Sequence, residues 1–254
     1  MTELVGLLFD VDGTLADTER DGHRVAFNKA FQEAGLTWNW SDQLYGELLA
    51  ITGGKERIQH YIDTYVENFQ APKALDVFIA ELHKSKTAYY THLLAGGAIP
   101  LRSGVQRLLQ EARQAGLRLG IATTTTPENV DALLLNTLGP DAAGWFEVIA
   151  AGDIVPKKKP APDIYFYAME KMGLKPDQCV AFEDSENGIR SAHGADLKTI
   201  ITVNDYTRDH DFTGATIVLD QMGEPNLPFD VLQGDAGQYT CLDVALIKQL
   251  HQSS

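Results

Sequence analysis

The stretch LLFDVDGTLADTE, residues 7–19, places four carboxylates directly after an apolar run. Residues 4–9 have the nearly continuous apolar pattern of a short strand that is buried on both faces, and Gly13 helps to end it. This strand would deliver Asp10 and Asp12 at its carboxyl end. Because a buried, unpaired carboxylate is costly and neighbouring carboxylates repel one another, the stretch predicts a cation among these acidic side chains.

The rest of the chain alternates short apolar runs with helical stretches. Further apolar runs lie at residues 117–122, 146–150, 179–182 and 199–203, and helical patterns lie at 104–116 and 127–139. Strands that alternate with helices form a doubly wound parallel sheet. We therefore expect an α/β fold with a Rossmann-like parallel sheet as its core.

Residues 17–95 differ from the rest, because they show helical periodicity without a convincing strand. We predict that they form an all-helical cap inserted into the core. Paired glycines and a proline at 95–100 suggest a hinge on one of its two tethers, and the other tether lies near 16–18. The predicted division is 1–16 core, 17–95 cap, 96–230 core and 231–254 C-terminal extension, the last with one helix near 241–250.

Charge and cysteine content narrow the possible partners and location. The 254-residue chain has a formal net charge of −14, which repels nucleic-acid backbones and anionic membrane surfaces. Cys179 and Cys241 are far apart in the sequence and fit neither a disulfide framework nor a thiolate zinc site. No signal sequence or membrane-spanning run is evident. We expect a cytoplasmic monomer that binds a small molecule rather than nucleic acid or membrane.

Polar residues follow the apolar runs at the positions where parallel strands end. In an open parallel sheet, ligands bind outside the carboxyl ends of the strands, so these residues should converge. The set comprises Asp10, Asp12, Thr123, Thr124, Lys159, Glu183 and Asp184. The four carboxylates would form an oxygen-rich cage for Mg²⁺, and a hydroxyl and a lysine beside it would bind a phosphoryl group. The pattern therefore indicates phosphoryl transfer to a carboxylate.

Four segments, FDVDGTL, ATT, KPAPDIY and FEDSENGI, resemble in order and position the motifs of the haloacid dehalogenase-like phosphohydrolases. The resemblance implies that Asp10 is the nucleophile that forms an aspartyl phosphate. It also implies that Asp12 is the general acid and then the base, and we expect neighbouring carboxylates to raise its pKa. Thr123 and Lys159 would hold the transferring phosphoryl. The metal ligands implied are Asp10, Asp12 through its backbone carbonyl, Asp184, and Glu183 in support.

DTERDGHRVAFNKAF and TGGKERI further resemble the CbbY-type branch of this superfamily, whose members dephosphorylate xylulose-1,5-bisphosphate. The resemblance implies that cap residues contact the distal phosphate and that Asp17 and His23 face the sugar. Related sequences can carry Glu at position 17, so the shorter Asp weakens that expectation. The implied substrate-binding set is Asp17, His23, Gly53, Gly54, Lys55, Arg57 and Thr124.

Other interpretations remain beside this one. A sugar phosphomutase of the β-phosphoglucomutase kind would share the same core, and the sequence barely separates it from a phosphatase. A receiver domain is disfavoured, because the D-x-D pair follows the first strand and a cap-sized insertion comes next. Thr126 and Pro127 fit a helix start rather than a ligand site. Lys157 and Lys158 fit a solvated charge run.

Overall fold

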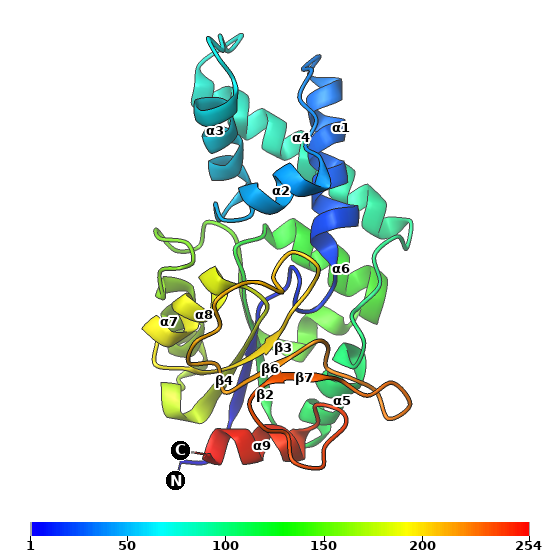
Figure 1. Cartoon of the computed structure of the whole chain (residues 1–254), viewed down its shortest axis with the longest axis vertical. Helices are drawn as coiled ribbons and strands as arrows, with labels where there is room; N and C mark the ends of the chain where they lie inside the picture. The colour runs from blue at the N-terminus through cyan, green and yellow to red at the C-terminus, as the bar shows by residue number, and fades with distance from the viewer. Residues whose placement is uncertain (1, 254) are drawn as a thin grey trace.

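The computed structural model describes residues 2–253 and has two parts, a core built on a sheet and a helical cap above it (Figure 1). The sheet has seven strands in the order β3-β2-β1-β4-β5-β6-β7. Their bounds are β1 Gly6–Phe9, β2 Arg118–Ala122, β3 Phe146–Ala150, β4 Cys179–Glu183, β5 Lys198–Thr202, β6 Ile217–Leu219 and β7 Val231–Gln233. All neighbouring strands are parallel except β6 and β7. This arrangement confirms the predicted α/β fold with a parallel sheet.

β1 lies in the middle of the sheet and is buried throughout. Because side chains alternate along a strand, Leu7 and Phe9 enter the hydrophobic cluster on one face and Leu8 enters the cluster on the other. The first cluster includes residues of α5 (Val105–Gln114), α6 (Pro127–Leu138) and α9 (Val244–Gln252). The second includes residues of α7 (Asp163–Met172) and α8 (Glu186–Gly194). Burial on both faces explains the continuous apolar run.

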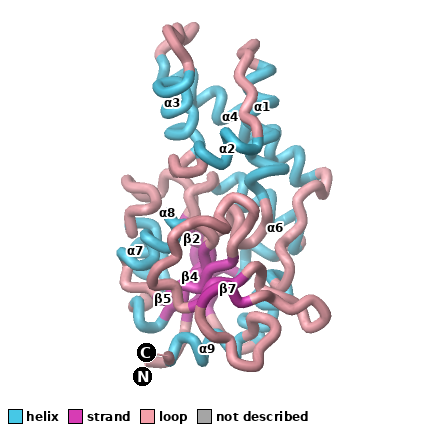
Figure 2. Tube along the Cα trace, viewed as in Figure 1, coloured by secondary structure: helices cyan, strands magenta, loops and turns pink. Residues whose placement is uncertain are grey.

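The cap is built from helices, as Figure 2 shows by colour. It contains a π-helical turn at Glu19–His23 followed by α1 (Arg24–Glu33), α2 (Asp42–Leu48), α3 (Gly54–Tyr65) and α4 (Leu75–Ala95). Residues 17–95, all of which the structure describes, contain no strand. A separate aromatic cluster that includes Phe27, Phe31, Trp40 and Tyr45 forms the interior of the cap. The cap therefore has its own hydrophobic cluster, while Ala26, Tyr90 and Leu94 of α1 and α4 join the cluster of the core.

The chain beyond residue 210 adds structure that the sequence pattern does not reveal. β6 and β7 are only three residues long, and β7 extends the sheet antiparallel to β6 at one edge. The predicted C-terminal extension thus begins with a strand of the sheet and ends with α9, the helix expected near 241–250. Among residues 2–253, no helix combines the length and the apolar character needed to cross a bilayer.

Candidate active site

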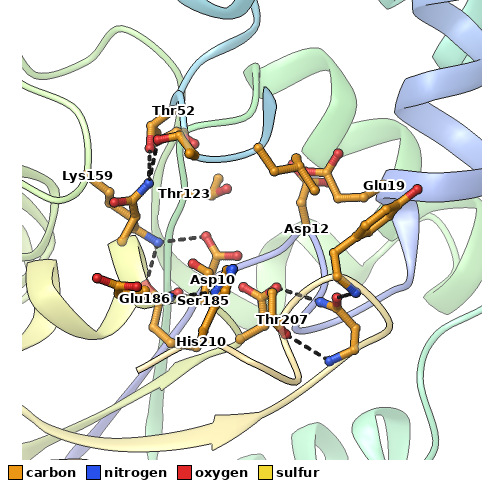
Figure 3. Close-up of a pocket in the computed structure, with 18 of the residues that line it drawn as sticks. Asp10, Asp12, Glu19, Thr52, Thr123, Lys159, Ser185, Glu186, Thr207 and His210 are labelled. Carbon is orange, nitrogen blue, oxygen red and sulfur yellow. Dashed lines mark hydrogen bonds and ion pairs between the residues drawn. The ribbon is translucent and has the colours of Figure 1, made fainter. Parts of the chain in front are cut away.

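The carboxyl ends of β1, β2 and β4 open into a cavity of about 340 Å³ beneath the cap (Figure 3). The strands end at the same level, since Phe9 is paired with both Ile121 and Phe182 in the sheet. Every strand-end residue predicted above lines this cavity: Asp10, Asp12, Thr123, Thr124, Lys159, Glu183 and Asp184. The register of the sheet therefore explains why the ends of β1, β2 and β4 meet at one site, and the loop after β3 brings Lys159 to them.

Lys159 lies between two carboxylates at the floor of the cavity. Its Nζ donates to Oδ1 of Asp10 at 2.7 Å and to Oε1 of Glu183 at 2.6 Å. Burial raises the pKa of Asp10 to about 7, although Lys159 opposes this rise. Burial lowers the pKa of Lys159, but its two carboxylate partners outweigh this effect and hold the pKa above the usual range. Lys159 therefore stays an ammonium ion beside the predicted nucleophile.

Three carboxylates form a group that could hold a metal ion. One oxygen from each of Asp10, Glu183 and Asp184 lies within 4.8 Å of the others, and all three residues are buried. Burial and the charges of Asp10 and Glu183 raise the pKa of Asp184 well above its usual value. A divalent cation would remove this repulsion, and an all-oxygen donor set fits a hard ion. Gly13 keeps the space open, because a Cβ at its φ of 85° would overlap the Asp184 carboxylate.

The carboxylate of Asp12 belongs to a different set of contacts. Its Oδ1 accepts a hydrogen bond from Thr18 Oγ1 at 2.6 Å and lies 2.9 Å from His23 Nε2. Lys86 Nζ lies 2.8 Å from the other ring nitrogen, Nδ1 of His23. Burial alone would raise the pKa of Asp12, but the positive charge shared by His23 and Lys86 and the hydrogen bonds from His23 and Thr18 lower it below its usual range. The expected rise was wrong, because cations from the cap act on this carboxylate more strongly than its acidic neighbours.

A second cavity of about 450 Å³ adjoins the first and shares Asp12, Glu19, Gly53, Arg57 and Thr124 with it. Its lining from the cap is rich in cations and imidazoles: His23, Lys55, His83 and Lys86. The core contributes the first turn of α6 and Lys158. The structure thus has room for a ligand longer than one phosphoryl group.

Arg57 and the two glycines at the start of α3, Gly53 and Gly54, shape the wall between the two cavities. Arg57 is buried, and its Nε donates to the carbonyl of Leu48 at 3.1 Å while its Nη1 donates to the Tyr45 hydroxyl at 3.0 Å. Gly53 has a φ of 96°, in the region that favours glycine. A Cβ at Gly54 would come within 2.5 Å of His83 Nε2. Arg57 therefore fixes the cap loop and also lines both cavities.

Lys55 and Lys158 join the cap to the core beside the second cavity. Lys55 Nζ lies 2.5 Å from Asp153 of the core, and Lys158 Nζ lies 2.9 Å from both Glu56 of the cap and Asp153. The side chain of Lys158 is only 14% exposed. The prediction of a solvated Lys158 was therefore wrong, because opposite charges from two parts of the molecule enclose it.

Asp17 does not reach either cavity, contrary to the expectation that it faces the sugar. Its side chain is 68% exposed and lies 3.2 Å from Nε of Arg102. The physical reason is the ion pair with the buried Arg102, which holds Asp17 beside a separate surface pocket that also contains Arg20 and Asp220.

Two further residues of the site escaped the sequence analysis. Glu19 lines both cavities and accepts a hydrogen bond from the Tyr45 hydroxyl at 2.5 Å. Asn204 follows β5 and donates to Oδ2 of Asp184 at 2.6 Å. Glu19 is the fourth carboxylate of the opening stretch, and Asn204 comes directly after the apolar run that ends at residue 203. The strand-end rule could have identified Asn204.

Comparisons with known proteins agree with this geometry. The family model for haloacid dehalogenase-like hydrolases matches residues 5–196. Protein CbbY from Rhodobacter capsulatus is 50% identical over 213 residues, which cover 84% of this chain and 91% of that protein. A CbbY protein from Cupriavidus necator is 43% identical over 252 residues, covering 98% of this chain and 97% of its own length. A solved structure of a CbbY mutant from Rhodobacter sphaeroides with xylulose-1,5-bisphosphate is 45% identical, with a TM-score of 0.81 and coverage of 86% of this chain and 94% of the other.

Proposed function

Because this chain belongs to the haloacid dehalogenase-like hydrolases and resembles CbbY proteins over most of its length, we propose that it is a Mg²⁺-dependent phosphatase that hydrolyses xylulose-1,5-bisphosphate to xylulose 5-phosphate. Its membership of the family and its CbbY relatives make it a phosphatase acting on a phosphorylated sugar. The observation that carries the proposal is Asp10, which is held by Lys159 at the floor of a cavity under the cap.

The residues of the cavity can divide the reaction into two steps. Asp10 attacks phosphorus and forms an aspartyl phosphate, while Asp12 gives a proton to the leaving sugar oxygen. Because Asp12 is ionised before substrate binds, this proton first reaches its carboxylate from His23, which is in turn reprotonated by the neighbouring Lys86 ammonium. Water then attacks the aspartyl phosphate, Asp12 takes a proton from that water, and Asp10 and inorganic phosphate are released. Lys159 and Thr123 hold the phosphoryl oxygens in line with Asp10. Thr18 and His23 fix the direction of the Asp12 carboxylate.

Mg²⁺ would be held by Asp10 and Asp184, with the backbone carbonyl of Asp12 and with Glu183 in support. When bound, it supplies positive charge to the phosphoryl oxygens and keeps the nucleophile ionised. Asn204 orients Asp184 for this purpose through its hydrogen bond. The raised pKa values of Asp10 and Asp184 support the assignment, because burial and neighbouring carboxylates disfavour their charged forms more than Lys159 and Arg102 favour them, and a divalent cation would offset this.

The second cavity supports a substrate with two anionic ends. It shares a wall with the first cavity and has Lys55, Lys86 and Arg57 in its lining. In an otherwise acidic protein, these cations provide a local site for a distal phosphate. A bisphosphate of a five-carbon sugar would place one phosphate at Asp10 and the other toward this cap pocket.

A phosphate-release assay over a panel of phosphosugars, with and without Mg²⁺, tests the proposal. We expect release from xylulose-1,5-bisphosphate that requires Mg²⁺ and falls at least about a thousandfold in Asp10→Asn. Asp17→Asn is the matched control, since Asp17 lies outside both cavities, and it should retain activity within about twofold. Interconversion of sugar monophosphates without phosphate release would instead identify a mutase. Comparable turnover by Asp10→Asn would refute Asp10 as the nucleophile.

A further inference from the structure

We propose that Tyr165 of α7 is a positioning residue that holds Glu183 and, through it, the ammonium group of Lys159. The Tyr165 hydroxyl donates to Oε1 of Glu183 at 2.5 Å. The same oxygen accepts from Lys159 at 2.6 Å, so it receives two hydrogen bonds. This role rests on the phosphatase function proposed above, because Lys159 is assigned there to the phosphoryl group.

The surroundings of Tyr165 suit a fixed support rather than a substrate contact. Its side chain is fully buried in the hydrophobic cluster under α7, and it does not line the cavity that contains Asp10. Its ring lies 5.3 Å from Nζ of Lys159, at cation–π distance. Tyr165 therefore touches both members of the Glu183–Lys159 pair from behind.

Few contacts other than those with Tyr165 and Lys159 fix the orientation of the Glu183 carboxylate. Within residues 2–253, its second oxygen, Oε2, is buried and has no hydrogen-bond partner. That oxygen lies against Gly188 in the first turn of α8, where a Cβ would overlap the carboxylate. The orientation of Glu183 therefore depends on the two donors at Oε1, of which only Tyr165 is independent of the phosphoryl site.

This arrangement has a consequence for phosphoryl transfer. When a phosphoryl group enters, Lys159 must donate a hydrogen bond to a phosphoryl oxygen in place of the one that it now donates to Asp10. Glu183 then remains its fixed partner. Without the Tyr165 hydroxyl, the carboxylate can rotate and carry Lys159 away from its place, which weakens contacts that matter most in the transition state.

Tyr165→Phe tests the proposal because it removes the hydroxyl and keeps the ring. We expect kcat for p-nitrophenyl phosphate and for the sugar bisphosphate to fall about tenfold with KM changed less than about threefold. Binding of inorganic phosphate in Mg²⁺ buffer, measured by calorimetry, should weaken about fivefold. Binding of Mg²⁺ alone should weaken less than phosphate binding, by at most about twofold, since Asp10 and Asp184 are untouched and Glu183 is placed only in support of the metal. Tyr167→Phe on the same helix is the control and should leave all four values unchanged.

Gly188→Ala places a methyl group against the other oxygen of Glu183 and should produce the same losses in kcat and in phosphate binding as Tyr165→Phe. Gly144→Ala is its control, because a Cβ there meets no atom within 4 Å. Unfolding curves identify any variant that is simply unstable. If Tyr165→Phe leaves kcat and phosphate binding unchanged, or if it weakens Mg²⁺ binding more than phosphate binding, the positioning role is wrong. If the wild-type protein releases no phosphate from any phosphosugar, the proposed function fails, while the binding of inorganic phosphate and Mg²⁺ still decides the role of Tyr165.

Discussion

His83 of α4 is a half-buried histidine whose surroundings oppose a positive charge. Its ring packs over Gly54, next to the second cavity. Burial, followed by the charges of Lys86, Lys55, Lys158 and His23, lowers the pKa of His83 to about 3. The imidazole is therefore neutral in the folded protein at any pH near neutrality, whereas in the unfolded chain it titrates near its ordinary value of 6.5.

The sign of the resulting pH dependence follows from proton linkage. Below pH 6.5 the unfolded chain binds a proton at His83 that the folded chain does not bind until about pH 3, so this residue reduces stability as the pH falls through that window. The wild-type protein loses unfolding free energy as the pH falls below 6.5. We expect this loss to be smaller in His83→Gln by up to about 1.4 kcal/mol per pH unit. Urea unfolding at several values between pH 7 and 4 measures this difference. Exposed His92 provides the control, His92→Gln, and identical slopes for wild type and His83→Gln would contradict the assignment.

Asp12 illustrates which residue properties a sequence pattern can predict. Its position at the end of β1 follows from the apolar run before it, and the structure places it in the cavity. The direction of its pKa shift was not predictable, because it depends on His23 and on Lys86, which lies 63 residues beyond His23 in the chain. Local periodicity carries no information about such a contact between helices.

At the scale of elements, Arg102 connects the second tether of the cap to the sheet. Its side chain is 8% exposed, and its guanidinium donates to backbone carbonyls in three separate segments. The accepting residues are Gly13 in the loop after β1, Thr202 and Val203 at the end of β5, and Asp220 after β6. Arg102 thus fixes the loop that carries Asp10 and Asp12 against the neighbouring strand ends.

Replacing Arg102 by methionine should therefore destabilise the core. The variant leaves four inward-facing carbonyl groups without their donor, and we expect a loss of about 3–5 kcal/mol in the free energy of unfolding. Urea denaturation would show a lower midpoint with an unchanged m-value. The comparison is Arg113→Met, because Arg113 is exposed on α5 and only stacks on Trp145, which should cost less than about 1 kcal/mol. Equal losses in the two variants would mean that the carbonyl contacts contribute little.

The elements differ in how far the sequence predicts them, for a physical reason. β1, β2, β4 and β5 are buried over most of their length, β3 at the edge is partly buried around an apolar run, and each was located to within two residues. β6 and β7 have three residues each, too few for a period to emerge, and β7 is exposed at the edge of the sheet. In the site, residues fixed by strand register were placed correctly, whereas Asp17 was not, because its direction depends on Arg102 rather than on any local pattern.

At the scale of the whole molecule, the cap and the core meet through polar contacts around the two cavities and through an apolar contact, in which Ala26, Tyr90 and Leu94 of the cap helices join the hydrophobic cluster of the core. Lys55 and Glu56 of the cap pair with Asp153 and Lys158 of the core. Across the first cavity, Asn187 of α8 donates to the Ala50 carbonyl and to the Thr52 hydroxyl, both at 3.1 Å. Ion pairs and single hydrogen bonds of this kind are individually weak, so we expect this polar side of the interface to separate at lower cost than the apolar contact of α1 and α4 with the core.

Lys158 is the member of this interface whose removal should shift the balance between closed and open caps. Lys158→Ala deletes both of its ion pairs, and a loss of about 1 kcal/mol shifts the closed-to-open ratio about fivefold. If entry requires an open cap, the association rate of inorganic phosphate in Mg²⁺ buffer should rise by about the same factor. Stopped-flow tryptophan fluorescence can follow this step, because Trp38 and Trp40 lie in the cap.

Removing a cation beside the site would by electrostatics alone slow the approach of an anion, so a faster rate isolates the effect of opening. Lys157→Ala is the control, because Lys157 is the neighbouring residue, carries the same charge and is exposed. Its association rate should be at or below that of the wild type. A rate for Lys158→Ala that is no higher than that of Lys157→Ala would show that the ion pairs do not hold the cap closed.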